Sequence, residues 1–441
     1  MANYRLLKVI LILLIVVMVT PFDHSQALGA GAVYKNPIAF VRGSEIAITN
    51  SDGDTPTRII YPEKTSTAHF LYGRPQWSPD GNQVITSEYS QKDDGAETMR
   101  LIRLLNGDRL ESFLSITGYE SGHMTTIPMV WTQSGEEIAY FNGIGIFLMP
   151  ATGGQPKLLY TPNIARMIGE GPGEGDPAAR LDSIEQEANP LFVPFHLINT
   201  AYGLLVGTAL ETPDGGVDTW GMVSLDGKLL WTANFSTTPI VSPDGKQAIV
   251  GYDGPLGDTV PAPDSKPVVL VDLKTGKVTP TKIQPGGIPL GWGVDGKAVF
   301  VGVQSKVAEV TGIGDSPVGQ VLFPDTWPVM TVENTLTLWW YSMDNPGTIK
   351  PIKLFETRGH SFGVMTVGRT DDLPIVFSIV SSSLPMIESI NKGATQEEAK
   401  ALLPTVELYA LDVRNSEIRW KMPGGRPSYG TADFWVAVSP Q

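Results

Sequence analysis

A five-residue turn motif recurs along the chain and divides most of it into similar units. Trp77-Ser78-Pro79-Asp80-Gly81 is the clearest copy, Ser242-Pro243-Asp244-Gly245 matches it closely, and weaker copies end at Gly135 and Gly296. Proline presets φ at the second turn position, and glycine takes the left-handed conformation that closes a tight hairpin. The glycines are spaced by about 50 to 55 residues or twice that interval, a period typical of propellers and repeat arrays.

The apolar segments between these turns predict four strands in each unit, so the predicted fold is all-β: a closed β-propeller of four-stranded antiparallel blades. Counting units gives eight blades. Seven is the alternative, because residues 328–355 form an irregular unit without an obvious fourth strand. The first unit lacks its leading strand, which residues 434–440 could supply beside residues 37–41. We therefore expect the ring to close by pairing of the C-terminal and N-terminal strands, which removes exposed sheet edges.

Residues 1–27 are predicted to be a secretory signal peptide. Arg5 and Lys8 precede an uninterrupted apolar run over residues 9–19, and Ser25-Gln26-Ala27 supplies small residues for cleavage. The run is shorter than the ~20 residues that span a bilayer, and an uncleaved anchor is the alternative. We expect an extracellular or periplasmic protein with no membrane span in the mature chain.

The remainder, residues 28–441, is expected to be a single β-propeller domain with two insertions. The first, 161–190, is rich in glycine, proline and acidic residues. The second, 381–404, contains Thr395 and Glu398 at capping-box spacing, which predicts a helix at residues 399–403.

Composition excludes several function classes. The chain has 441 residues, of which 42% are hydrophobic, so it can bury a large core. It contains no cysteine, which excludes disulfides, a thiol nucleophile and thiolate metal ligands. Its net charge of -14 repels phosphate backbones, so nucleic acid is not an expected partner.

The repeats resemble those of a known family. The turn at Trp77-Ser78-Pro79-Asp80-Gly81 and the strand that enters the turn Asp272-Leu273-Lys274-Thr275-Gly276 resemble the TolB-type, WD-like propeller repeats of exported bacterial proteins, and also the propeller domains of prolyl oligopeptidases. Members of these families include interaction scaffolds, peptidase gates and a few lyases. The resemblance therefore implies the fold and leaves the activity open.

One stretch has the form of a hydrolase motif. Gly359-His360-Ser361-Phe362-Gly363 matches Gly-x-Ser-x-Gly, but that motif needs a following helix and a downstream histidine. Here a strand-forming segment follows, and no histidine occurs after His360. We therefore predict that Ser361 is not a catalytic nucleophile.

Three histidines share one position in the repeat. His69, His123 and His360 stand at the same offset before Gly81, Gly135 and Asp372, which would place them at one face of the disc. Three neutral imidazoles that converge there could hold a divalent metal ion. The alternative is that they are ordinary loop histidines, because the equivalent positions of two other units are Ala233 and Gln284.

The function predicted from the sequence is an exported, non-catalytic interaction module that binds a protein or glycan partner. It would have no catalytic residue and no cofactor, and its two insertions would contact the partner. The alternative is a metal-dependent lyase or hydrolase in which His69, His123 and His360 bind the metal or ligand. A structural subunit of an envelope assembly is a third possibility.

Overall fold

A computed structural model describes most of the predicted propeller. The structure describes residues 37–42, 45–50, 58–60, 69–72, 75–81, 83–91, 97–105, 109–116, 128–142, 145–161, 194–212, 215–235, 237–251, 267–293, 295–323, 327–343, 351–367, 375–425 and 434–438. All of these lie in a compact unit that spans Tyr34–Gln441. The predicted signal peptide and all but the first residue of the first insertion lie outside the described residues. Within the described ranges, no helix is long and apolar enough to cross a membrane.

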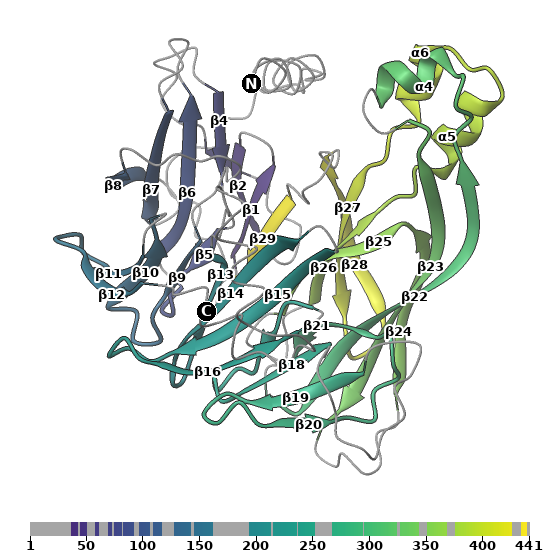
Figure 1. The fold of residues 1–441 in the computed structure, drawn as a ribbon. Coiled ribbons are helices and arrows are strands. Elements are labelled where there is room, and N and C mark those ends of the chain that lie inside the picture. Colours follow the sequence, from purple (N-terminus) through teal and green to yellow (C-terminus); the bar gives the residue numbers. More distant parts are fainter. Residues whose placement is uncertain are drawn as a thin grey trace. The chain divides into compact units, whose positions relative to one another are not determined.

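The described strands form seven antiparallel sheets, numbered here in chain order (Figure 1). Sheet 1 contains β29 (Phe434–Val438), β1 (Pro37–Arg42), β2 (Glu45–Asn50) and β3 (Arg58–Ile60); sheet 2 contains β4 (His69–Tyr72), β5 (Gln76–Trp77), β6 (Gln83–Gln91), β7 (Glu97–Leu105) and β8 (Arg109–Ile116); sheet 3 contains β9 (Met129–Trp131), β10 (Glu137–Phe141), β11 (Ile146–Pro150) and β12 (Lys157–Tyr160). Sheet 4 contains β13 (Pro194–Thr200), β14 (Gly203–Thr212), β15 (Gly215–Val223) and β16 (Leu229–Asn234); sheet 5 contains β17 (Ile240–Val241), β18 (Gln247–Gly251), β19 (Val268–Asp272) and β20 (Val278–Pro280). Sheet 6 contains β21 (Ile288–Trp292), β22 (Ala298–Thr311), β23 (Met330–Ser342) and β24 (Ile352–Gly359); sheet 7 contains β25 (Ser361–Val367), β26 (Ile375–Val380), β27 (Val406–Asp412) and β28 (Glu417–Gly425). The fold is therefore all-β, built from repeated four-stranded antiparallel sheets as expected of a propeller.

The described residues form seven sheets, where the unit count favoured eight. The expected sixth and seventh units are two halves of sheet 6, because β22 pairs with β23 along its whole length. The connection 312–329 leaves the sheet between these two strands, so the second half resembles the start of a new unit. This also explains why residues 328–355 lacked a fourth strand of their own.

The recurring motif forms the predicted hairpin turn. Gly81, Gly135, Gly245 and Gly296 all have φ between 69° and 73°, in the left-handed region. In the first copy the Gly81 amide donates to the Ser78 carbonyl at 2.8 Å. The Ser78 hydroxyl accepts a hydrogen bond from the Gln83 amide at 3.0 Å. The serine and glycine thus fix the turn from both ends.

The C-terminal strand completes the first sheet. β29 pairs antiparallel with β1, from Phe434 opposite Arg42 to Val438 opposite Ile38. The expected pairing of residues 434–440 with residues 37–41 is therefore present over the described part of the segment. β29 also contacts β5 and β25, which lead sheets 2 and 7.

Neighbouring sheets pack face to face through buried apolar side chains. Between sheets 4 and 5, Trp220 and Phe235 pack with Val250 and Val269. Comparable clusters join sheets 2 and 3, 3 and 4, 5 and 6, and 6 and 7. Full burial of one such side chain stabilises the fold by about 1.5 to 3 kcal/mol. A sheet that is covered by a neighbouring sheet on each face buries the side chains of both faces. Its strands therefore contain long apolar runs instead of strict alternation.

The aromatic residue of the motif links successive leading strands. Trp131 Nε1 in β9 donates to the Gln76 carbonyl in β5 at 3.2 Å. Trp292 Nε1 in β21 donates to the Ile240 carbonyl in β17 at 2.7 Å. These bonds join the leading strands of sheets 2 and 3 and of sheets 5 and 6 in the same way, so the repeat has a structural function beyond its turn.

Candidate functional site

The two ends of the sheets carry very different connections. Connections after the first strands of sheets 2 to 6 are tight turns that lie against one another: an added Cβ on Gly135 would lie 3.3 Å from Pro79, and one on Gly296 would lie 3.8 Å from Pro243. We name this side the turn face. The four longest connections all follow a second or fourth strand and therefore leave from the opposite side, the loop face; they are 161–193, 252–267, 312–329 and 381–405.

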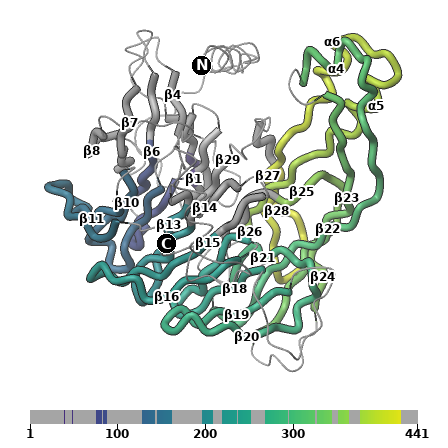
Figure 2. Tube along the Cα trace, in the orientation of Figure 1, coloured from purple at the N-terminus to yellow at the C-terminus, as the bar shows by residue number. Residues whose placement is uncertain are grey.

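Two of these connections fold together as one helical module, defined as residues 303–323, 327–333 and 381–405 (Figures 1 and 2). The connection from sheet 6 carries α4 (Pro317–Leu322). The connection from sheet 7 carries α5 (Leu384–Asn391) and α6 (Gln396–Ala401). Beyond Gly302, β22 pairs only with β23, so this hairpin extends from sheet 6 and supports the helices.

The module has its own apolar core. Phe323 follows α4 and is buried with Met386, Ile387 and Ile390 of α5 and with Ala399 of α6. The Trp327 ring packs 5.8 Å from the Phe323 ring, centroid to centroid. Side chains from both connections share this core, so each connection buries apolar surface against the other.

The short helices begin at residues suited to that position. The Ser316 side chain accepts from the Gly319 amide, and Pro317 follows it at the first helical position. Thr395 and Glu398 form the predicted capping box at the start of α6. The Thr395 amide and then its hydroxyl donate to the Glu398 carboxylate, and this lowers the pKa of Glu398. The predicted capped helix is confirmed, although it spans Gln396–Ala401 instead of residues 399–403.

Side-chain hydrogen bonds attach the helices to the hairpin. Asn391, at the end of α5, donates to the Thr311 carbonyl at 2.9 Å and accepts from the Ile313 amide at 2.9 Å. The Ser382 hydroxyl donates to the Val332 carbonyl at 2.8 Å, and the Thr331 and Ser383 hydroxyl oxygens lie 2.6 Å apart. These bonds fix the orientation of the second connection on the first.

The end of the hairpin carries an apolar strip, defined as Ile313, Met330 and Val332, of which the first two are exposed and the third is half-buried. Met330 is paired with Thr311, the last residue of β22, and the Gly312 amide donates to the Val329 carbonyl at 2.9 Å, so Ile313 directly follows the paired part of the hairpin. Met330 and Ile313 are 61% and 54% exposed, whereas Val310 and Val329 pack against the module core. Five of the ten large hydrophobic side chains exposed within the described residues belong to the module: Val307, Ile313, Val321, Met330 and Leu402.

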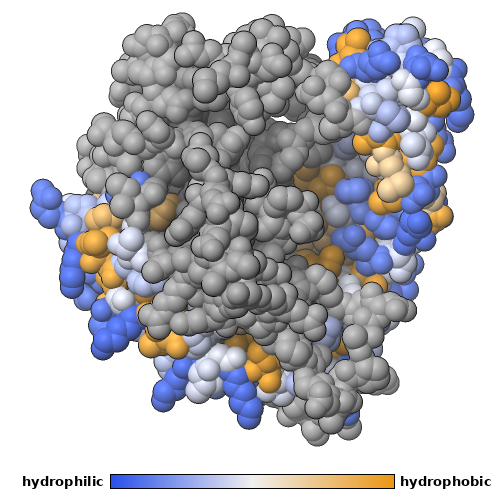
Figure 3. All heavy atoms as spheres, in the orientation of Figure 1, coloured by the Kyte–Doolittle hydropathy of each residue, from blue (hydrophilic) through white to orange (hydrophobic). Residues whose placement is uncertain are grey.

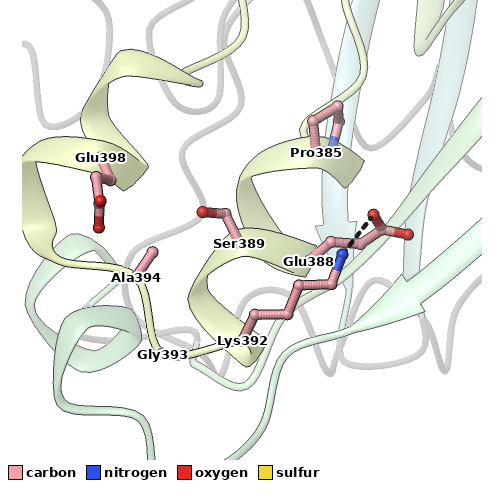
Figure 4. Close-up of a pocket in the computed structure, with 7 residues that line it drawn as sticks. All are labelled: Pro385, Glu388, Ser389, Lys392, Gly393, Ala394 and Glu398. Atoms are coloured by element: carbon pink, nitrogen blue, oxygen red, sulfur yellow. Dashed lines mark ion pairs between the residues drawn. The ribbon is translucent and has the colours of Figure 1, made fainter.

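A hollow lies between α5 and α6 (Figure 4). Its lining includes Glu388, Ser389 and Lys392 from the α5 side and Glu398 from α6. The Lys392 ammonium group lies 3.7 Å from the Glu388 carboxylate, across one helical turn. Two carboxylate residues therefore line the hollow: Glu388 pairs with Lys392, and Glu398 accepts two hydrogen bonds from Thr395.

The module is acidic. Its described residues include six carboxylates, on Glu309, Asp315, Glu333, Glu388, Glu397 and Glu398, against three ammonium groups. Each of these lysines pairs with a carboxylate of the module, as Lys306 does with Glu309 and Lys400 with Glu397. Figure 3 shows hydrophilic and hydrophobic residues side by side on the module surface.

The arrangement does not resemble a nucleophilic active site. Ser389 and Lys392 have Ser-x-x-Lys spacing, but the lysine pairs with Glu388, and Figure 4 shows it directed away from the Ser389 hydroxyl. Ser361 lies at the start of strand β25 instead of before a helix. The prediction that the Gly-x-Ser-x-Gly stretch is a chance match therefore agrees with the local structure.

The structure places the three predicted site histidines unequally. His360 is exposed between β24 and β25, its Nδ1 lies 3.4 Å from the Val332 carbonyl, and its own carbonyl accepts from Asn334 Nδ2 at 2.7 Å. His69 opens β4, and only its backbone is described. His123 lies outside the described residues. No metal-binding cluster occurs within the described ranges, and the proposed histidine site stays a prediction.

Sequence reasoning missed the apolar strip and the hollow. Residues 312–329 were divided between two expected units, so their helix was overlooked. Two local signals were available: Ser316-Pro317 has the residues of a helix start, and Pro385 stands near the beginning of α5. No local pattern could show that the two connections meet.

Comparisons with known proteins give resemblance at low identity. No protein-family model matches, and no curated protein matches by sequence. A TolB protein from Agrobacterium tumefaciens is 13% identical with a TM-score of 0.36, over 92% of this chain and 99% of its own. The propeller domain of the Trilobed protease from Pyrococcus furiosus is 11% identical with a TM-score of 0.33, over 82% and 99%. An acylaminoacyl peptidase from Pyrococcus horikoshii is 11% identical with a TM-score of 0.36, over 70% and 49%.

Proposed function

We propose that the protein is an exported, ring-closed propeller of seven blades that binds a protein or glycan partner on its loop face through the helical module. It acts by binding and carries out no chemistry on the partner. The extracytoplasmic location rests on the signal peptide predicted at residues 1–27. The expected domain organisation, a single propeller over residues 28–441, is part of the same proposal.

Three observations support ring closure. β29 pairs with β1 of sheet 1 and also contacts β25 of sheet 7 and β5 of sheet 2, so the last segment of the chain adjoins both ends of the series. Apolar clusters join each consecutive pair from sheet 2 to sheet 7. Tryptophan bonds link the leading strands of sheets 2 and 3 and of sheets 5 and 6. Closure would leave no sheet face exposed at the ends of the series.

The asymmetry of the two faces carries the functional proposal. The described turns are short on one face, and the four longest connections leave from the other. Binding residues concentrate on loops that a rigid scaffold positions. Here two such connections form a helical module with its own apolar core and with exposed apolar side chains. A loop that only joined two strands would need neither feature.

Site-specific photo-cross-linking in the protein's native cells tests this proposal. A photoreactive amino acid replaces Met330 on the module in one variant and Lys246 on the turn face in the other; both side chains are exposed, so both variants should fold. We expect a discrete adduct from position 330 and none from position 246, and mass spectrometry would identify it as peptide or glycan. An adduct from position 246 alone, or equal adducts from both, would contradict the proposal.

A further inference from the structure

We infer that the partner contacts the helical module through a segment that combines apolar side chains with arginine or lysine. This inference deepens the proposed function and depends on it. It commits to one kind of occupant, a cationic and apolar peptide segment, for the surface made of the apolar strip and the hollow between α5 and α6.

The apolar requirement follows from the exposed strip. Met330 and Ile313 are both more than half exposed at the end of a hairpin that hydrogen bonds hold in place. Removing such side chains from water stabilises a complex in proportion to the apolar area buried. A rigid strip also requires little ordering on binding, since Asn391 already ties the Ile313 backbone to α5.

The cationic requirement follows from the charges around the strip. Glu309 is directly opposite Val332 across the hairpin and shares its face, and Asp315 stands two residues after Ile313 in sequence. Glu333, the next residue along β23, points to the opposite face and pairs with Arg358 at 3.5 Å. The module's three lysines each pair with one of its six carboxylates, so the described part of the module keeps a net negative charge. A partner with basic side chains would meet complementary charge here, and the chain's net charge of -14 acts in the same direction at longer range.

Asn391 connects the strip to the hollow. Asn391 bonds the Ile313 amide, and the next residue, Lys392, lines the hollow. A segment with its apolar residues on the strip could therefore place a guanidinium or ammonium group near Glu388 and Glu398. Arginine suits such a site, because its planar group donates several hydrogen bonds to carboxylates.

A second copy of the chain fits this surface less well. Two modules would bring carboxylates against carboxylates, and close approach of like charges opposes association. The surface is therefore expected to bind a different chain, and self-association through the strip is an outcome that the experiment must detect.

The test uses three synthetic peptides of equal length with the full mature chain. One alternates leucine and arginine, the second leucine and glutamate, and the third serine and arginine. Binding is measured by fluorescence anisotropy at physiological ionic strength. We expect the leucine–arginine peptide to bind at least tenfold more tightly than either of the others. Equal binding of the serine–arginine or the leucine–glutamate peptide would overturn the inference.

Matched variants locate the binding surface. Met330→Glu and the double variant Glu388→Gln with Glu398→Gln should each weaken leucine–arginine binding at least tenfold; glutamine can replace glutamate in the capping box, so α6 keeps its start. Two control variants lie outside the module. They are Ile352→Glu, at a 49% exposed position on β24, and the double variant Glu356→Gln with Glu417→Gln. Both should bind the leucine–arginine peptide within twofold of the wild type. An equal loss of peptide affinity in the module variants and the control variants would overturn the inference. A wild-type dimer that Met330→Glu dissociates would also overturn it. Cross-linking from position 330 without binding of this peptide would refute the partner chemistry alone and leave the proposed function standing.

Discussion

At the scale of single residues, the glycines of different copies of the turn share a backbone conformation but have different neighbouring atoms. Gly245 and Gly296 have φ of 71° and 69°, so any other residue there is strained. A Cβ added at Gly245 would lie 2.6 Å from the Ala201 backbone nitrogen, whose amide donates to the Gly245 carbonyl at 2.9 Å. At Gly296 the nearest atom to an added Cβ would be 3.8 Å away.

Alanine at these two positions should therefore have unequal effects. Gly296→Ala is expected to lower the free energy of unfolding by about 1 to 2 kcal/mol, the cost of a left-handed conformation in an L-residue. Gly245→Ala should lower it by a further ~1 kcal/mol or more, since the clash is with backbone that cannot rotate away. Urea unfolding of both variants measures the difference. Equal losses would mean that the contact between the turns of sheets 4 and 5 is absent in solution.

The sequence indicated what each motif residue does inside its own turn, and the structure agrees. It did not indicate what each residue contacts in the next sheet. The Trp131 and Trp292 bonds to neighbouring carbonyls join residues more than fifty positions apart, and the indole nitrogen has no local partner that a pattern could reveal. Such contacts depend on how the sheets stack.

At the scale of elements, sequence patterns predicted one part of the helical module correctly and another part wrongly. Thr395 and Glu398 define the start of α6 through residues three apart, so the sequence alone was sufficient. Sheet 6 was divided wrongly because β22 and β23 continue past the edge of the sheet and their connection folds elsewhere. The hydrophobic pattern of the sequence locates strands well. It cannot distinguish a long connection within one sheet from the boundary between two sheets.

The capping box gives a prediction for α6. Thr395→Ala should destabilise this helix by about 1 kcal/mol and lower the hydrogen-exchange protection of its amides roughly fivefold, while Thr395→Ser should change little. Protection should also fall on acidification. The pKa of Glu398 is lowered in the folded state. The ionised Glu398 carboxylate therefore stabilises the helix fully above the usual glutamate pKa, and this stabilisation is lost as the pH falls through the folded pKa. Glu398→Gln should abolish this pH dependence, and a variant that keeps it would contradict the assignment.

At the scale of the whole molecule, the central claim is that the C-terminal strand closes a ring of seven sheets. The sequence predicted the pairing of residues 434–440 with residues 37–41 because the first unit lacked a strand and the last segment could supply it. The number of sheets was harder to predict, because it depended on assigning residues 328–355 correctly. The shared position of His69, His123 and His360 gives no information on whether their side chains converge, since sequence offset does not fix side-chain direction.

Cysteine cross-linking between β1 and β29 tests this claim most directly, because the chain has no cysteine of its own to compete. Ala39→Cys with Ala437→Cys joins residues that are directly opposite, as does Ile38→Cys with Val438→Cys, and the two pairs sample both kinds of antiparallel site. Ala39→Cys with Val436→Cys is the control, shifted by one residue so that the side chains point to opposite faces. The account predicts that at least one matched pair oxidises to a disulfide that raises the melting temperature, and that the shifted pair stays reduced. Failure of both matched pairs, or equal oxidation of the shifted pair, would contradict it.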